Sequence, residues 1–156
     1  MYDCDDCPIA GRRAFLRDVS AWLAAAFMAP LPLRFGRAIA VRDTLHTYPV
    51  PAADGATIDK DNQVIVVRAA GKAYAFNLSC PHQNTALRWH PEDNQFQCPK
   101  HHSRYQPDGV FISGRATRSM DRFALTKDGG NLVVDLDKLF RQDQDAAGWA
   151  AAVVAL

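Results

Sequence analysis

The sequence predicts an all-β fold with helical segments only at its two ends. From residue 45 onward, short apolar runs alternate with polar residues and are separated by turn residues, which is typical of antiparallel strands. Hydrophobic residues make up 48% of the 156 positions and charged residues 22%, close to the globular average. We therefore expect one packed domain with a short appendage, because this length leaves little room for two separate cores.

The strands are predicted where apolar residues recur between turns. Residues 63–68 and 72–77 flank an Ala-Ala-Gly turn, which is typical of a β-hairpin. In the second of these strands Tyr74 and Phe76 alternate with small residues, so we expect one face of it to be buried. Further strands are expected at residues 95–97, 110–113, 123–126 and 132–136, the last two joined by an Asp-Gly-Gly-Asn turn.

The first 40 residues are predicted to be an export signal rather than part of the domain. Residues 11–17 read Gly-Arg-Arg-Ala-Phe-Leu-Arg, and an apolar run follows at residues 19–33. This pattern resembles a twin-arginine (Tat) signal, in which Arg12 and Arg13 are recognised by the export machinery and have no catalytic role. Export of a protein that is already folded suits one whose cofactor is inserted in the cytoplasm.

The fate of this signal has more than one interpretation. Pro30 and Pro32 interrupt the apolar run, which is shorter than the ~20 residues that span a bilayer comfortably. Small residues before position 41 fit cleavage after Ala40. An uncleaved signal that anchors the protein to the inner membrane is one alternative, and an amphipathic helix of the fold is another.

The remaining sequence divides into a domain at residues 41–136 and a tail at residues 137–156. The tail is the only other helix candidate, and its alanine-rich end is apolar enough to need cover. A helix packed on the domain is the expected outcome. The net charge of +1 gives no basis for nucleic-acid binding, which usually needs a clustered basic face and a high pI.

Two short motifs carry the chemistry. Cys80-Pro81-His82 and Cys98-Pro99-Lys100-His101 form C-x-H and C-x-x-H, separated by fifteen residues, and each offers one thiolate and one imidazole. This pair of motifs resembles the two loops of the Rieske family, and the resemblance extends over about residues 64–135. It implies an antiparallel β sandwich of the Rieske type with a small cluster-binding subdomain. It also implies a [2Fe–2S] cluster, with Cys80 and Cys98 on one iron and His82 and His101 on the other.

Two residues after the second motif sharpen the resemblance. Ser103 and Tyr105 have the Ser-x-Tyr spacing of high-potential Rieske proteins in quinol-oxidising cytochrome bc complexes. In that subfamily the serine hydroxyl donates to a bridging sulfide and the tyrosine hydroxyl to a cysteine sulfur, which stabilises the reduced cluster. The alternative is that both are ordinary polar residues of a loop.

The sequence also departs from that subfamily. The extra cysteine that each loop usually carries, and that forms a bracing disulfide, is replaced by Thr85 and by Lys100. The glycine usual after the second histidine is His102 here. Residues 114–116, Gly-Arg-Ala, resemble the glycine-containing loop that covers the cluster, but its proline-rich form is absent. These differences put loop stability and quinone docking in doubt.

The same residues could serve in other kinds of site. A zinc ion accepts two sulfur and two nitrogen ligands, but C-x-H is not the usual spacing of a zinc finger. A disulfide between Cys80 and Cys98 would leave His82 and His101 without a purpose. No role is expected for His46, His90, His102, Cys4 or Cys7.

Three functional classes fit an exported protein with one such cluster and no catalytic site of its own. The first is the electron-transfer subunit of a respiratory or photosynthetic complex that oxidises quinol and reduces a cytochrome. The second is the small subunit of a molybdoenzyme resembling arsenite oxidase, with a larger catalytic subunit as partner. The third is a stand-alone periplasmic Rieske ferredoxin. A Rieske oxygenase is excluded because the chain has no room for a second domain with mononuclear iron.

Overall fold

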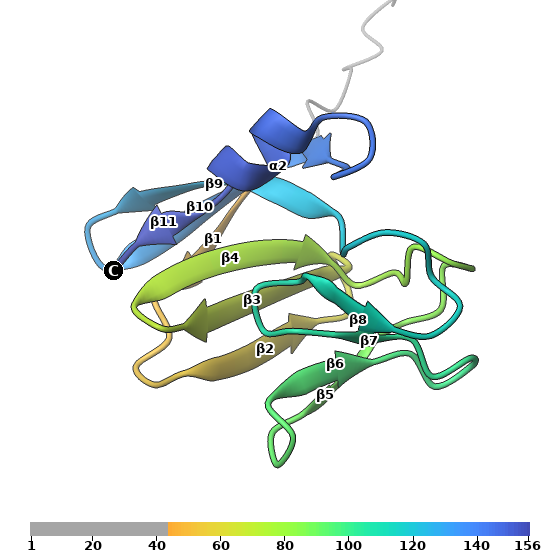
Figure 1. Ribbon diagram of the computed structural model, residues 1–156. Coiled ribbons are helices and arrows are strands. Elements are labelled where there is room, and N and C mark those ends of the chain that lie inside the picture. Colours follow the sequence, from red (N-terminus) through yellow and green to blue (C-terminus); the bar gives the residue numbers. More distant parts are fainter. Residues whose placement is uncertain (1–43) are drawn as a thin grey trace, which may run out of the picture. The chain divides into compact units, whose positions relative to one another are not determined.

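Two antiparallel β-sheets form the framework of residues 44–156, the part of the chain that the computed structural model describes (Figure 1). One short helix near the C-terminus accompanies them, so the prediction of an all-β fold with a C-terminal helix is confirmed. The predicted export signal, with Arg12, Arg13 and Ala40, lies outside these residues, as do Cys4 and Cys7. Within residues 44–156, no helix has the length and apolar character needed to cross a bilayer.

The larger sheet has seven strands. Six of them follow the order β1-β10-β9-β4-β3-β2, and β11 pairs with β4. Their bounds are β1 Leu45–Pro49, β2 Gly55–Asp59, β3 Val64–Ala69, β4 Lys72–Asn77, β9 Arg122–Asp128, β10 Asn131–Phe140 and β11 Val154–Ala155.

The smaller sheet has four strands in the order β5-β6-β7-β8. These are β5 Arg88–His90, β6 Gln95–Gln97, β7 Arg104–Tyr105 and β8 Phe111–Ser113. The whole small sheet comes from the segment between β4 and β9, although these two strands are neighbours in the large sheet and pair at Phe76 and Arg122. Both predicted candidate loops therefore belong to one excursion of the chain, which we call the metal-binding lobe (residues 78–121).

The hairpin of β3 and β4 forms as predicted. Ala69 pairs with Lys72, which leaves a two-residue turn at Ala70 and Gly71. Both turn residues have positive φ, 51° and 74°, as a type I′ turn requires. Because β4 runs from this turn towards Cys80, the turn marks the end of the strand away from the first motif.

The central strands are buried on both faces, whereas the sequence pattern predicted one buried face for β4. Tyr74 and Phe76 pack into a core that they share with lobe residues such as Phe96 and Tyr105. The alternate residues Ala73 and Ala75 are also fully buried, because a second core packs on the opposite face. Small side chains there allow the backbone of β4 to lie close to its neighbours. The members of the second core are Val64, Val66, Ala73, Ala75, Phe123, Leu125, Leu132 and Val134.

The C-terminal tail is less helical than the sequence predicted. Strand β10 continues past residue 136 to Phe140, because Leu139 and Phe140 pair with β9 after a register shift. Helix α2 covers only Ala146–Ala151, and the Asp145 carboxylate caps it by accepting from the Gly148 N–H at 2.8 Å. The tail then returns to the sheet as β11.

A buried arginine joins the helix to the domain. The Arg122 guanidinium is stacked on the indole of Trp149, 3.5 Å from the ring centroid, and donates to the Trp149 carbonyl at 2.8 Å. Another nitrogen of the same guanidinium donates to the carbonyl of Asp108 in the lobe at 2.7 Å. The Trp149 indole N–H donates to the Met120 carbonyl at 2.7 Å. Helix α2 is thus tied both to β9 and to the lobe.

Candidate metal centre

The two predicted motifs lie on two loops with the same backbone design. The first loop follows β4, and the second joins β6 to β7. In the first, the Cys80 carbonyl accepts from the Asn84 N–H at 2.9 Å, and the Cys80 N–H donates to the Thr85 carbonyl at 2.8 Å. Each cysteine is therefore held at the start of a five-residue turn that closes on its own carbonyl.

The second loop repeats this pattern. The Cys98 carbonyl accepts from the His102 N–H at 3.0 Å, and the Cys98 N–H donates to the Ser103 carbonyl at 2.9 Å. In both loops a proline follows the cysteine, Pro81 in one and Pro99 in the other, and its fixed φ favours the first corner of a turn.

The residue that closes each turn has a left-handed backbone. Asn84 has a φ of 51° and His102 a φ of 56°. Asparagine tolerates this region, whereas a histidine there carries a strain of roughly 1–2 kcal/mol. The position of His102 explains why glycine is usual there in the resembling proteins: the backbone, and not the ligand set, requires it.

The two cysteines are buried and free, so the alternative of a disulfide between them is not formed. Cys80 is fully buried and Cys98 is 1% exposed. Burial raises the pKa of the Cys80 thiol, which disfavours the thiolate in the absence of a bound cation. A metal ion at this place would supply the charge that a buried thiolate needs.

The two histidines face each other across the loops. The ring centroids of His82 and His101 are 4.8 Å apart, with 66° between the ring planes. The Nδ1 atom of each ring is buried without a hydrogen-bond partner, although both side chains as a whole are half-buried. Such orphaned nitrogens require an explanation, and a metal between the loops provides one. The exposed part of each ring is then the edge away from Nδ1.

The surroundings of His101 favour its neutral form. Partial desolvation lowers its pKa, and the charges of His82, Arg115 and Lys100 act in the same direction. A neutral imidazole is the form that binds a metal.

The spacing of these donors does not fit one ion. If all four residues bound a single zinc ion at about 2.3 Å or less, no two donor atoms could lie more than about 4.6 Å apart. Among residues 44–156, the His, Cys, Asp and Glu donor atoms that gather in threes or more within 4.8 Å are those of His90, Glu92 and Asp93 alone. No three of the four predicted ligands therefore have donor atoms that all lie within 4.8 Å of one another, which disfavours a single tetrahedral ion.

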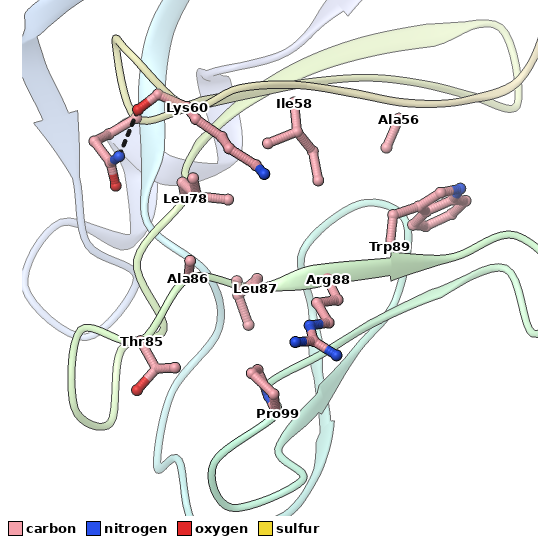
Figure 2. A pocket seen from close by; sticks show the side chains of 11 residues that line it. Ala56, Ile58, Lys60, Leu78, Thr85, Ala86, Leu87, Arg88, Trp89 and Pro99 are labelled. Carbon is pink, nitrogen blue, oxygen red and sulfur yellow. Dashed lines mark hydrogen bonds between the residues drawn. The ribbon is translucent and has the colours of Figure 1, made fainter.

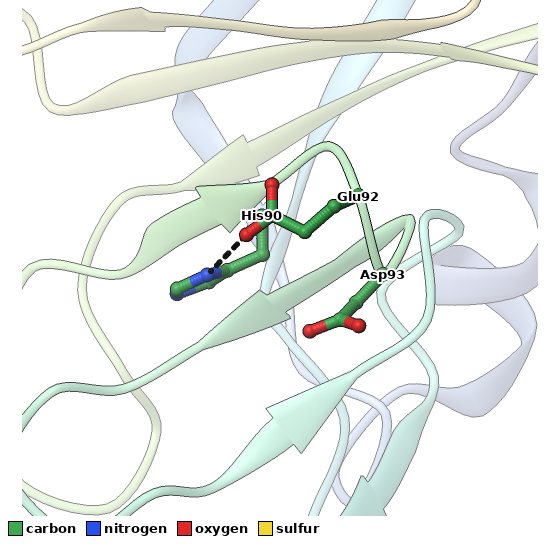
Figure 3. Close-up of side chains that lie close together, drawn as sticks. All are labelled: His90, Glu92 and Asp93. Carbon is green, nitrogen blue, oxygen red and sulfur yellow. Dashed lines mark hydrogen bonds and ion pairs between the residues drawn. The ribbon is translucent and has the colours of Figure 1, made fainter.

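The group His90, Glu92 and Asp93 lies at the exposed turn between β5 and β6 (Figure 3). His90 Nδ1 and Glu92 Oε1 are 3.4 Å apart, and the pKa of Glu92 is lowered mainly by a backbone hydrogen bond and by His90. An exposed pair of this kind contributes little free energy.

Tyr105 and Ser103 lie directly beside the cysteines. The Tyr105 hydroxyl is 3.4 Å from Cys80 Sγ, and the ring is fully buried. Burial, followed by the bond to Cys80, raises the pKa of Tyr105, so its hydroxyl stays protonated and can donate to sulfur. Ser103 is also fully buried, and its Oγ accepts from the Ala116 N–H at 3.0 Å. That contact leaves the hydroxyl proton of Ser103 free to donate elsewhere.

The loop at residues 114–116 closes over Ser103. Gly114 has a φ of 113°, and a Cβ there would overlap the Cα of Ser103 and lie 2.9 Å from its N and Oγ atoms. Only glycine allows this close backbone approach. The predicted covering loop is therefore present beside the second motif.

A groove of about 810 Å³ runs beside the first loop (Figure 2). Ile58 and Ala56 of β2 line one side, and Leu87 and Trp89 line the other. The groove is mostly apolar, and Thr85 and Pro99 connect it to the two loops. Its lining includes none of the four predicted ligands.

The sequence did not reveal several residues that shape the site. Asn84 closes the first turn, and its position four residues after a cysteine, like that of His102, was the available signal. The Ala116 N–H was invisible because a backbone donor has no sequence signature. The charges of Lys100 and Arg115 near His101 depend on loops that meet only in the folded chain.

Comparisons with known proteins identify the family of this chain and several of its relatives. A family model, the Rieske [2Fe–2S] domain, matches residues 46–125. The cytochrome b6-f complex iron-sulfur subunit of Synechococcus sp. (strain JA-3-3Ab) is 31% identical over 100 residues, which are 62% of this chain and 58% of that protein. The subunit of the same description from Chlorobaculum tepidum is 29% identical over 76 residues, covering 49% of this chain and 42% of that protein.

A solved structure, the cyanobacterial plasma membrane Rieske protein from Synechocystis PCC 6803, is 26% identical, with a TM-score of 0.44. The match covers 51% of this chain and 82% of that one. The present chain aligns with roughly half the length of the two curated relatives named above. The family model nevertheless covers more than half of the sequence, so the chain belongs to the Rieske [2Fe–2S] domain family, and a Rieske-type [2Fe–2S] cluster is its cofactor.

Proposed function

We propose that Cys80 and Cys98 bind one iron of the cluster, that His82 and His101 bind the other, and that the chain is an electron-transfer subunit. The single observation that carries the ligand assignment is the pair of buried Nδ1 atoms without partners, facing each other beside two buried free cysteines. Such a cluster accepts and returns one electron, and histidine ligation raises its potential above that of an all-cysteine cluster.

The two pairs of predicted ligands differ in how deeply they are buried. Cys80 and Cys98 hold the inner side, where burial excludes water. His82 and His101 are half-buried and present their outer edges to the surface. An electron therefore has a short path from the histidine side to a partner docked on the lobe. No residue pair in this arrangement offers substrate chemistry of its own.

Ser103 and Tyr105 tune the site in this proposal. The Tyr105 hydroxyl lies within donating distance of Cys80 Sγ, and the Ser103 O–H remains available to donate because its oxygen only accepts from the Ala116 N–H. Hydrogen bonds donated to the sulfur atoms stabilise the extra electron of the reduced state. With these two hydrogen-bond donors, the cluster is expected to be of the high-potential Rieske type.

The complex that fits best oxidises quinol and reduces a cytochrome on the periplasmic side of the membrane. Two relatives named as cytochrome b6-f subunits and the Ser-x-Tyr spacing support this choice. The predicted Tat signal, cleaved or retained as a membrane anchor, would place the domain in the periplasm. A molybdoenzyme small subunit and a stand-alone ferredoxin are the alternatives that a test must separate.

Electron paramagnetic resonance of the dithionite-reduced protein tests the cofactor, because a reduced [2Fe–2S] cluster gives a signal and zinc is silent. Ser103→Ala should retain the cluster and lower its midpoint potential in protein-film voltammetry, whereas the exposed Ser113→Ala should leave it unchanged. Equal potentials in the two variants would contradict the role of Ser103. Copurification from native membranes, followed by mass spectrometry, would separate a cytochrome partner from a molybdoenzyme.

A further inference from the structure

Exposed cationic side chains flank the second loop, which carries Cys98 and His101. Lys100 directly precedes His101, and Arg115 lies between Gly114 and Ala116, both of which approach Ser103; both cationic side chains are exposed. Gln97, which directly precedes Cys98, pairs with Arg88 on one neighbouring strand and with Arg104 on the other. The side chains of these three residues therefore lie on the same face of the small sheet. Both arginines are exposed as well. We call Lys100, Arg115, Arg88 and Arg104 the cationic collar.

The acidic residues of the lobe are Glu92, Asp93, Asp108 and Asp121, and none of them forms an ion pair with a collar residue. Residues 80–91, 94–107 and 109–120 contain no Asp or Glu. Among the ion pairs of residues 44–156, none involves a collar residue. Arg118 on the same lobe is different, because it is paired with Asp121 and lies 3.8 Å from Asp143.

The collar is a local feature and not a consequence of the overall charge, which is only +1. A cluster of like charges around a half-exposed redox group stores repulsion that a partner of opposite charge relieves. Such rim charges mainly accelerate and orient encounter, because they act over about 8–10 Å at ordinary ionic strength.

From this arrangement we infer that the redox partner meets the lobe with an acidic protein surface around its own redox centre. The inference rests on the proposed function and specifies the kind of partner. A protein is favoured over a membrane surface because the collar flanks the loop that carries His101, and the electron has to leave through the exposed edge of that imidazole. A bilayer covering this edge would block that exit.

The test compares one haem protein in two charge states. Cytochrome c with unmodified lysines presents a basic surface, and the same protein after succinylation presents an acidic one. The full-length holoprotein is titrated with each by calorimetry at low and high ionic strength. Stopped-flow absorbance then follows one electron from the reduced cluster to the ferric haem, which leaves an oxidised cluster and a ferrous haem without bond or proton transfer.

The variant Lys100→Glu/Arg115→Glu removes the charge of the collar. Its matched control is Lys72→Glu/Lys127→Glu, which changes the net charge equally but lies at the opposite end of the large sheet, where β4 begins and β9 ends. We expect the collar variant to weaken binding of succinylated cytochrome c, and to slow the electron transfer, by at least about tenfold at low ionic strength. The control variant should stay within about twofold of the wild type.

Three results would overturn the inference. They are salt-independent binding, equal losses in collar and control variants, and tighter binding to the unmodified cytochrome. A fourth would be collar-dependent sedimentation with phosphatidylglycerol vesicles but no binding of the acidic cytochrome, because the partner would then be a membrane. The electron paramagnetic resonance spectrum of each protein distinguishes failure of the two proposals. A wild-type chain without the cluster signal would overturn the proposed function. If the spectra are intact and any of the four results is obtained, only the inference of an acidic partner is overturned.

Discussion

Replacing Gly114 with alanine should damage the site without touching a ligand. The added methyl group would overlap the Cα of Ser103 and would lie 2.9 Å from its N and Oγ atoms. Because backbone atoms cannot rotate away, the loop at residues 114–116 must move. The hydrogen bond from the Ala116 N–H to Ser103 Oγ, now 3.0 Å, would then lengthen or break.

The magnitude follows from three contributions. A non-glycine residue with φ near 113° lies outside the left-handed helical region, which costs about 1–3 kcal/mol. Overlap with a packed neighbour costs about 1–3 kcal/mol more, and loss of one buried hydrogen bond about 1 kcal/mol. We therefore expect the free energy of unfolding to fall by at least about 3 kcal/mol, or the melting temperature by roughly 12 °C.

Two other glycines separate these contributions. Gly71 has a φ of 74°, but no atom lies within 4 Å of the position that a Cβ would occupy, so Gly71→Ala should show backbone strain of about 1–2 kcal/mol alone. Gly130 has neither positive φ nor a close neighbour, so Gly130→Ala should stay within about 0.5 kcal/mol of the wild type.

The assay combines thermal unfolding, followed by circular dichroism, with voltammetry of the holoprotein. Gly114→Ala should lower the midpoint potential as well as the stability, because Ser103 loses its fixed position. The two control variants should leave the potential unchanged. If Gly114→Ala destabilised the protein no more than Gly71→Ala does, or left the potential at the wild-type value, the close approach to Ser103 would not matter.

Three further predictions concern other parts of the fold. Trp149→Phe loses the 2.7 Å hydrogen bond to the Met120 carbonyl but keeps an aromatic face for Arg122. In urea unfolding it should lower the free energy of unfolding by about 1–2 kcal/mol, against about 3–5 kcal/mol for Trp149→Ala. Equal losses in the two variants would contradict the stacking role. His102→Gly should stabilise the protein by about 0.5–1 kcal/mol by relieving left-handed strain, and a lower melting temperature would refute this. Burial and the hydrogen bond to Asp59 raise the pKa of Tyr48 to about 12. The contribution of the protonated Tyr48 to the free energy of unfolding should therefore be complete below about pH 10 and be lost as the pH rises to about 12. The urea midpoint of Tyr48→Phe should not show this decline.

The sequence predicted best those strands whose ends are marked by turn residues. Strands β4 and β6 have the predicted bounds, because turn residues mark both ends. The short strands β5 and β7 were missed because their pairing depends on loops that meet only in the folded chain. The tail was predicted as helix because alanine favours one, but pairing with β9 extends β10 to Phe140.

The candidate site was easier to predict by residue than by geometry. Cysteine and histidine at fixed spacing pointed to the two loops, and the structure brings His82 and His101 to within 4.8 Å of each other. The backbone contacts that position Cys80, Cys98 and Ser103 have no counterpart in residue type, so the sequence could not predict them. The cationic collar was hidden for a similar reason, because it gathers residues from three separate segments.

The path of the chain through the large sheet has a consequence for how the protein matures. Strands β4 and β9 are neighbours, although the whole metal-binding lobe is inserted between them in sequence. The two ends of the lobe therefore lie close together, at the edge of the large sheet where β4 ends and β9 begins. We therefore expect binding and loss of iron to rearrange the lobe while the seven-stranded sheet keeps its strand pairing. The large sheet of an iron-free chain should then already be folded when the cofactor is inserted.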